Sequence, residues 1–118
     1  MSGGIAFTNE IAWMVGSQPI TALLNDLKHQ YAAKPQSLLS ARIDRALETM
    51  LLFVDVSDLT DSEFNDFCSS VVKFSTKEFS NNPSWIVQVV ELLKILLQDR
   101  RLQNNLRSEI SYIIAKYR

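Results

Sequence analysis

The segment 84–98 constrains the fold of this chain more than any other feature of the sequence. When it is drawn as a helix, apolar residues cover nearly its whole circumference, and only Gln88, Glu91, Lys94 and Gln98 form a narrow polar stripe. A helix that is apolar on all sides must be buried against several neighbours. We therefore expect it to be the central helix of the domain. The β-branched run at 86–90 could also form a strand, but we identify no second strand to pair with it.

Helical periodicity also runs through most of the remaining chain. Gly16, Pro19, Pro35 and the Asn-Asn-Pro sequence at 81–83 disfavour helix continuation and divide the chain into about six segments. The helix that begins at Thr60 has the clearest boundary, because Thr60 and Glu63 can form a capping box. We expect the other helices over 8–15, 17–33, 37–54, 84–98 and 102–117.

Composition favours an all-α fold in one domain. The chain has 118 residues, 47% of them apolar, and only three Gly and three Pro, which is too few for the many tight turns of a β-sandwich or barrel. Residues 1–7 include the short polar sequence MSGG, which we interpret as a flexible leader or a cloning scar. We predict a single α-helical domain over 8–118, with about six helices in an antiparallel stack or bundle similar to armadillo or HEAT repeats.

The cysteine content and the apolar segments indicate where the chain acts. Cys68 is the only cysteine, so it cannot form an internal disulfide, and no amino-terminal secretion signal is recognisable. The longest apolar stretch, 85–97, is interrupted by polar residues and is shorter than the roughly 20 residues of a membrane span. We expect a cytosolic or nuclear protein that does not enter a membrane.

Residues suited to catalysis or to metal binding are few. His29 and Cys68 could pair as base and thiol nucleophile, but no third orienting group or oxyanion loop accompanies them, and a small apolar filler is the ordinary role of such a cysteine. The acidic residues between Asp55 and Asp66 lack the spacing and the glycine of a calcium loop. We expect no enzyme activity, no cofactor and no metal site.

The carboxyl-terminal end is basic. Residues 1–93 carry 6 basic and 11 acidic side chains, whereas residues 94–118 carry 6 basic and 2 acidic ones. If the last helix began near Asp99, three arginines would project to one side of it: Arg100, Arg107 and Arg118. Two interpretations stay open: RNA binding, or a basic face that is solvated or docks an acidic peptide. The residues that could serve either are Arg100, Arg101, Arg107 and Lys116.

Two aromatic residues are further candidates for partner binding. Trp13 lies in a short predicted helix, and Phe79 lies next to the Asn-Asn-Pro turn, so both are hard to bury fully. Aromatic residues are enriched among the anchors of protein interfaces. The alternative is that each lies at the edge of the core.

Three stretches of the chain resemble a known helical domain. These are residues 17–27 (SQPITALLNDL), residues 47–54, and the sequence SDLT at 57–60 that opens the Phe-rich helix. Together they are similar to the carboxyl-terminal helical domain of the large enhancer-of-mRNA-decapping scaffolds, called Hedls in animals and Varicose in plants. The resemblance covers roughly 17–97, and the chain departs from the pattern at 35–40 and in its extra segment 100–118.

The resemblance implies a scaffold function in mRNA decay. A member of this family would gather decapping factors into cytoplasmic processing bodies through self-association and contacts with decapping proteins, and catalysis would belong to those partners. We therefore expect a non-catalytic protein-protein interaction domain. The alternative is an RNA-binding helical module that uses the basic carboxyl-terminal helix.

Overall fold

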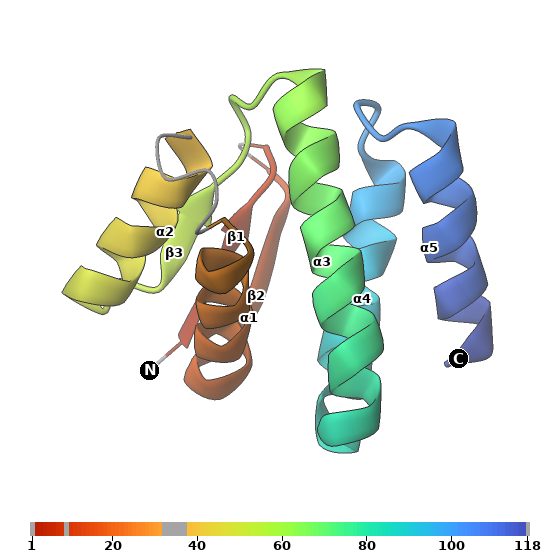
Figure 1. The fold of residues 1–118 in the computed structure, drawn as a ribbon, viewed down its shortest axis with the longest axis horizontal. Coiled ribbons are helices and arrows are strands. Elements are labelled where there is room, and N and C mark those ends of the chain that lie inside the picture. Colours follow the sequence, from red (N-terminus) through yellow and green to blue (C-terminus); the bar gives the residue numbers. More distant parts are fainter. Residues whose placement is uncertain (1, 9, 32–37, 118) are drawn as a thin grey trace. The chain divides into compact units, whose positions relative to one another are not determined.

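The described part of the chain contains a β-sheet as well as helices, so the prediction of an all-α fold with about six helices was wrong. The structure is a computed structural model that describes residues 2–8, 10–31 and 38–117. Within these ranges it has five α-helices and one three-stranded sheet (Figure 1). The chain divides into two compact units, Met1–Asp58 and Leu59–Arg118, where we expected one helical domain over 8–118.

The first unit is an α/β arrangement built around the sheet. Strand β1 is central, with β2 antiparallel on one side and β3 parallel on the other. Helix α1 contacts β1 and β2, and helix α2 contacts β3. The elements are β1 (Ser2–Ala6), β2 (Ala12–Gly16), α1 (Ser17–Gln30), α2 (Leu38–Thr49) and β3 (Phe53–Asp55).

The register of the sheet separates a buried face from an exposed one. Ile5 pairs with Trp13 on one side and with Val54 on the other, and all three side chains are buried. Gly4, one residue earlier, pairs with Met14 and Phe53, which are both exposed. Because successive side chains of a strand point to opposite faces, the buried and exposed residues alternate as the pleat requires.

Thr8 makes a hairpin turn where we predicted the start of a helix over 8–15. Its Oγ1 accepts hydrogen bonds from the backbone amides of Glu10 (3.1 Å) and Ile11 (2.9 Å), and the Phe7 amide donates to the Ile11 carbonyl (2.9 Å). A threonine hydroxyl can stabilise a turn in the same way as it caps a helix. The residues after the turn then form β2 and not a helix.

Two glycines allow the amino-terminal segment to form a strand. We had interpreted this segment as a flexible leader. A Cβ atom on Gly4 would lie 2.0 Å from the Trp13 carbonyl oxygen, and one on Gly3 would lie 2.2 Å from the Leu52 carbonyl oxygen. The backbone of β1 thus approaches its neighbours more closely than a residue with a side chain permits.

The second unit is helical. It consists of α3 (Asp61–Asn81), a 3₁₀ turn (Pro83–Trp85), α4 (Ile86–Gln98) and α5 (Asn104–Lys116), and each of the three α-helices contacts the other two (Figure 1). The predicted capping box is confirmed: Thr60 Oγ1 accepts from the Glu63 amide (3.2 Å), and the Glu63 carboxylate accepts from the Thr60 amide (3.0 Å).

The apolar segment forms helix α4, but it is not enclosed on all sides. Leu92, Leu93 and Leu96 are fully buried, whereas Glu91 and Lys94 are exposed and Val87 is 72% exposed. In a unit of three mutually packed helices each helix keeps one face open, so α4 is a member of the bundle and not its centre. None of the described helices is both long and apolar enough to cross a bilayer.

Candidate functional site

A hollow of about 410 Å³ lies between α2 and β3 in the first unit. One face of α2 forms one wall, because residues three, four and seven positions apart lie on the same side of a helix. The strand β3 and the turn before it form the other wall. The lining residues are Arg42, Arg45, Ala46, Thr49, Leu51, Phe53, Val54 and Asp55.

The turn between α2 and β3 brings these two walls together. Met50 ends the helix in the left-handed backbone region, with φ at 58°, which is uncommon for a residue with a side chain. Thr49 supports the turn, since its hydroxyl donates to the Arg45 carbonyl (2.8 Å) and accepts from the Leu51 amide (3.4 Å). The chain then reverses, so that β3 runs back along α2.

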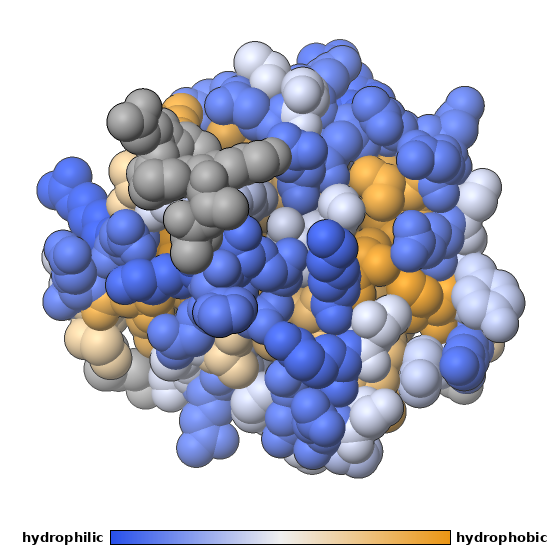
Figure 2. All heavy atoms as spheres, viewed as in Figure 1, coloured by the Kyte–Doolittle hydropathy of each residue, from blue (hydrophilic) through white to orange (hydrophobic). Residues whose placement is uncertain are grey.

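Apolar side chains at this turn are open to solvent. Leu51 is 72% exposed, Met50 52% and Phe53 48%. Figure 2 shows apolar atoms at the surface near the end of α2 and the start of β3, at the lower left of the view. Single exposed apolar residues are common on protein surfaces, but a group of them beside a hollow is typical of a binding site.

The two arginines that line the hollow differ in their bonding. Arg42 forms a bidentate ion pair with Asp58, with nitrogen–oxygen distances of 2.6 and 2.7 Å, and also donates to the Asp55 carbonyl (2.8 Å). The Arg45 guanidinium makes no hydrogen bond or ion pair with any other residue in the described ranges, and it is exposed. Arg42 is therefore fixed in place, whereas Arg45 is available to a ligand.

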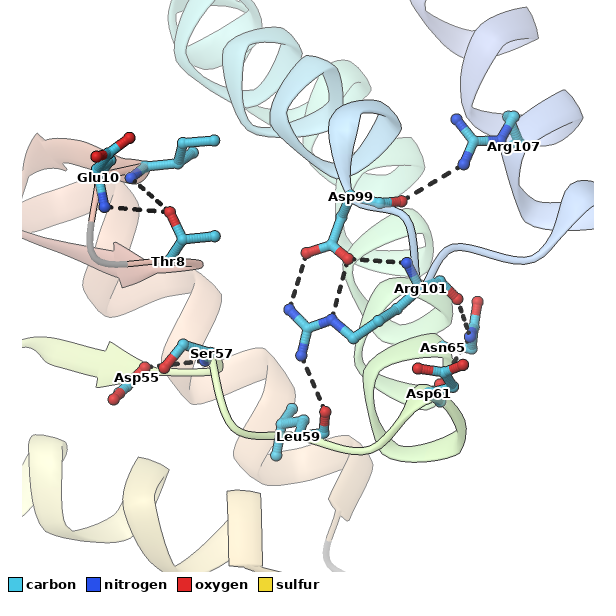
Figure 3. A network of polar contacts seen from close by, with 11 residues as sticks. Thr8, Glu10, Asp55, Ser57, Leu59, Asp61, Asn65, Asp99, Arg101 and Arg107 are labelled. Carbon is cyan, nitrogen blue, oxygen red and sulfur yellow. Dashed lines mark hydrogen bonds and ion pairs between the residues drawn. The ribbon is translucent and has the colours of Figure 1, made fainter.

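Hydrogen bonds within the first unit occupy some of the backbone polar groups at the outer edge of β3. The Asp55 carbonyl accepts from Arg42 and the Phe53 amide donates to the Leu51 carbonyl (2.6 Å). The Asp55 carboxylate accepts from the Ser57 amide at 2.9 Å (Figure 3). A strand edge whose polar groups are occupied is protected against pairing with another strand.

Of the four cations predicted at the carboxyl-terminal end, Arg101 belongs to an internal network. Its guanidinium forms a bidentate pair with Asp99 and donates a hydrogen bond to the Leu59 carbonyl at 3.0 Å (Figure 3). It also lies 4.0 Å from the centre of the Phe64 ring. Asn65 completes the network, because its side chain donates to the Arg101 carbonyl and accepts from the Gln103 amide, both at 2.8 Å. Arg101 therefore joins the α4–α5 connection to the start of α3.

The network determines the ionisation of both partners. Burial raises the pKa of Asp99, but the hydrogen bonds and positive charge of Arg101 outweigh that effect, so the pKa of Asp99 is lower than usual. The hydrogen bonds that Arg101 donates to Asp99 raise the pKa of Arg101, against the opposing effect of burial. The pair is thus fully charged at neutral pH.

The other three cations differ in their exposure and in the groups that they contact. Arg107 donates to the Leu97 carbonyl (2.6 Å) and the Asp99 carbonyl (3.4 Å), so it binds the carbonyl end of α4. Arg100 is exposed, but it lies before α5, which begins at Asn104, so the condition that the last helix begins near Asp99 is not met. Lys116 is exposed at the end of α5, 5.5 Å from the centre of the Tyr117 ring. The predicted Arg118 lies outside the described residues.

Both predicted aromatic anchors are buried. Trp13 is 3% exposed on the inner face of the sheet, and Phe79 is 4% exposed, with its ring centre 4.2 Å from that of Tyr117. Of the two alternatives left open by the sequence, the structure favours a core position for each. Neither is accessible to a partner.

The residues considered for catalysis are poorly placed for it. Cys68 is fully buried, and burial raises the pKa of its thiol, so the reactive thiolate does not form at neutral pH. His29 is exposed on α1. Within the described ranges, no three His, Cys, Asp or Glu residues are grouped as a metal site would need. Three of the acidic residues in 55–66 have structural roles instead: Asp55 in a turn, Asp58 in the Arg42 ion pair and Glu63 in the capping box.

Comparison with known proteins identifies no relative: no protein-family model matches the chain, and neither the curated proteins nor the solved structures give a match. The candidate site therefore depends on the geometry of this chain alone.

The hollow was missed in the sequence because we assigned all of 37–54 to one helix. The sequence alternates apolar and polar residues only over 54–57, which is a short signal for a strand. The burial of Leu52 between exposed Leu51 and Phe53 is visible only in the structure. Read that way, Leu51 and Phe53 are exposed apolar residues and not part of a helical core face.

Proposed function

We propose that this chain is a non-catalytic protein-interaction module and that the hollow between α2 and β3 is where it contacts its partner. The observation that carries the proposal is the group of exposed apolar side chains, Met50, Leu51 and Phe53, beside a hollow that also offers an unpaired arginine. Apolar and aromatic side chains with arginine are the residues from which interface hot spots are most often built.

The burial of Cys68 supports the non-catalytic part of the proposal. The sequence offers one thiol nucleophile, and its thiol is enclosed in the helical unit and protonated. A single reduced cysteine also suits the cytoplasm, where we propose that the protein acts.

The link to mRNA decapping stays a prediction from the resemblance alone. That resemblance takes 47–54 to be helical, whereas the structure has the end of α2, a turn and the start of β3 over these residues. RNA binding is the weaker alternative, because Arg101 and Arg107 bond to groups within the second unit and leave Arg100 and Lys116 as the exposed cations of the four.

The test is affinity capture from native cell extract with the wild-type chain and two variants. The double variant Leu51→Ser with Phe53→Ser removes the exposed apolar group, while Val87→Ser, on α4, removes an equally exposed apolar side chain elsewhere. We expect a set of proteins that the wild type and Val87→Ser retain and the double variant loses. Equal retention by all three, or no protein above the empty resin, would contradict the proposal, and circular dichroism checks that each variant folds.

A further inference from the structure

We infer that the hollow between α2 and β3 binds a short peptide segment that carries a carboxylate close to an apolar side chain. The inference rests on the proposed function and specifies the chemistry of the partner at the same hollow. It depends on three features: the unpaired Arg45, the exposed Leu51 and Phe53, and the occupied edge of β3.

Arg45 supplies the charge complementarity. The positive charge of Arg42 is already matched by Asp58, and the Asp55 carboxylate accepts from the Ser57 amide. Arg45 is thus the lining cation that has no counter-ion among the described residues. A guanidinium presents two parallel N–H donors that fit a carboxylate, so an acidic side chain is the ligand that it binds best.

Leu51 and Phe53 supply the apolar part of the recognition. They are 72% and 48% exposed, and both line the same hollow as Arg45. An apolar side chain of a ligand would remove their surface from water, which is the main favourable term in most protein association. A purely acidic ligand would leave this surface uncovered.

The partly occupied edge of β3 disfavours recognition by simple strand addition. The Asp55 carbonyl and the Phe53 amide are both engaged within the unit, so a partner strand cannot form a continuous ladder with them. Side chains must therefore carry the contact. The axis of α2 advances about 10 Å from Arg42 to Thr49, which corresponds to roughly three extended residues of a ligand.

The experiment selects ligands without assuming a natural partner. A phage-displayed library of random eight-residue peptides is selected against the full chain, and the recovered peptides are synthesised and titrated by fluorescence anisotropy. We expect the recovered sequences to be enriched in Asp or Glu within three positions of Leu, Phe or Trp. Recovery of basic, or of purely apolar, sequences would overturn the inference.

Matched variants then locate the bound peptide. Arg45→Gln is expected to weaken binding about tenfold and to remove its dependence on salt, because the screened charge pair is lost. The control Lys94→Gln removes an exposed cation on α4 and is expected to leave the affinity unchanged within twofold. Unchanged affinity in Arg45→Gln would overturn the acidic part of the inference.

The two proposals fail in different ways. If Leu51→Ser with Phe53→Ser abolishes peptide binding but Arg45→Gln does not, the hollow is an interaction site and the acidic chemistry is wrong. If the recovered peptides bind all these variants equally well, the hollow is not their binding site and the inference fails. Recovery of no peptide above background contradicts the inference but not the proposed function, which the affinity capture tests separately.

Discussion

Asp99 and Arg101 are the charged pair on which the second unit depends most. Their side chains are 9% and 13% exposed, and they link the α4–α5 connection to Leu59 and, through Asn65, to the start of α3. A buried charge that loses its partner is costly, whereas an exposed ion pair contributes little. This pair therefore matters for stability in a way that the exposed pair of Lys28 and Asp44 does not.

Asp99→Asn is expected to lower the free energy of unfolding by about 3 kcal/mol at pH 7, because it leaves the Arg101 charge without a counter-ion. The pKa of Asp99 is lower in the folded chain than in the unfolded one. The contribution of Asp99 to the free energy of unfolding is therefore fully present above its unfolded pKa, near 4, and is lost as the pH falls through its folded pKa. The difference between wild type and variant should therefore shrink below about pH 4. Urea denaturation of both proteins at several pH values measures this difference in stability.

The control for this prediction is Asp66→Asn, which changes an exposed carboxyl of α3 that forms no ion pair within the described ranges. Its effect at pH 7 should stay within about 0.5 kcal/mol. An equal loss of unfolding free energy in Asp99→Asn and Asp66→Asn would show that the Asp99–Arg101 pair contributes no more to stability than an exposed carboxylate.

The helices of the second unit could be predicted from the sequence because their signals are local. Thr60 and Glu63 are three residues apart, so a capping box can be recognised without knowledge of the fold. The interior of α4 was also predicted, since its buried leucines follow helical spacing. The exposed side of α4 could not be predicted. The number of helices that pack against an apolar helix decides which of its faces stays exposed, and the sequence does not give that number.

Thr60→Ala is expected to destabilise the chain by about 1 kcal/mol, because it removes the hydroxyl that accepts a hydrogen bond from the Glu63 amide at the start of α3. Glu63→Gln should lower the stability by less, since a glutamine side chain can also accept a hydrogen bond from the Thr60 amide. Thermal unfolding followed by circular dichroism compares the two variants. Equal stability of Thr60→Ala and the wild type would mean that the cap does not contribute.

The sheet could not be predicted because its pairings are distant in the sequence. β1 pairs with β3 across about fifty residues, and each strand is too short for its pattern to be distinguished from one or two turns of helix. Gly3 and Gly4 were interpreted as flexible, although they are the residues that allow the close approach of β1 to its neighbours.

Gly4→Ala is expected to destabilise the chain by more than about 2 kcal/mol, because the added Cβ would overlap the Trp13 carbonyl oxygen. Gly16→Ala is the matched control: no atom lies within 4 Å of its added Cβ, and its φ of −63° suits alanine. Chemical denaturation should show a small change for Gly16→Ala and a large one for Gly4→Ala. Similar stability of both variants would show that β1 does not pack as described.

The two units of the chain differ in what they offer a partner. In the helical unit, the arginines predicted to bind RNA are largely engaged in internal bonds. In the α/β unit, the turn after α2 exposes Leu51 and Phe53 beside the unpaired Arg45. We therefore expect binding to depend on the first unit and to tolerate changes on the surface of the second.

Photo-crosslinking in native cells tests this expectation most directly. A benzoylphenylalanine is placed at Leu51 in one protein and at Val87 in another, two positions that are 72% exposed in different units. After irradiation, we predict a discrete crosslinked protein from position 51, its yield reduced by Arg45→Gln, and none of the same mass from position 87. A crosslink from position 87 alone, or identical products from both positions, would contradict the hollow as the partner-binding site.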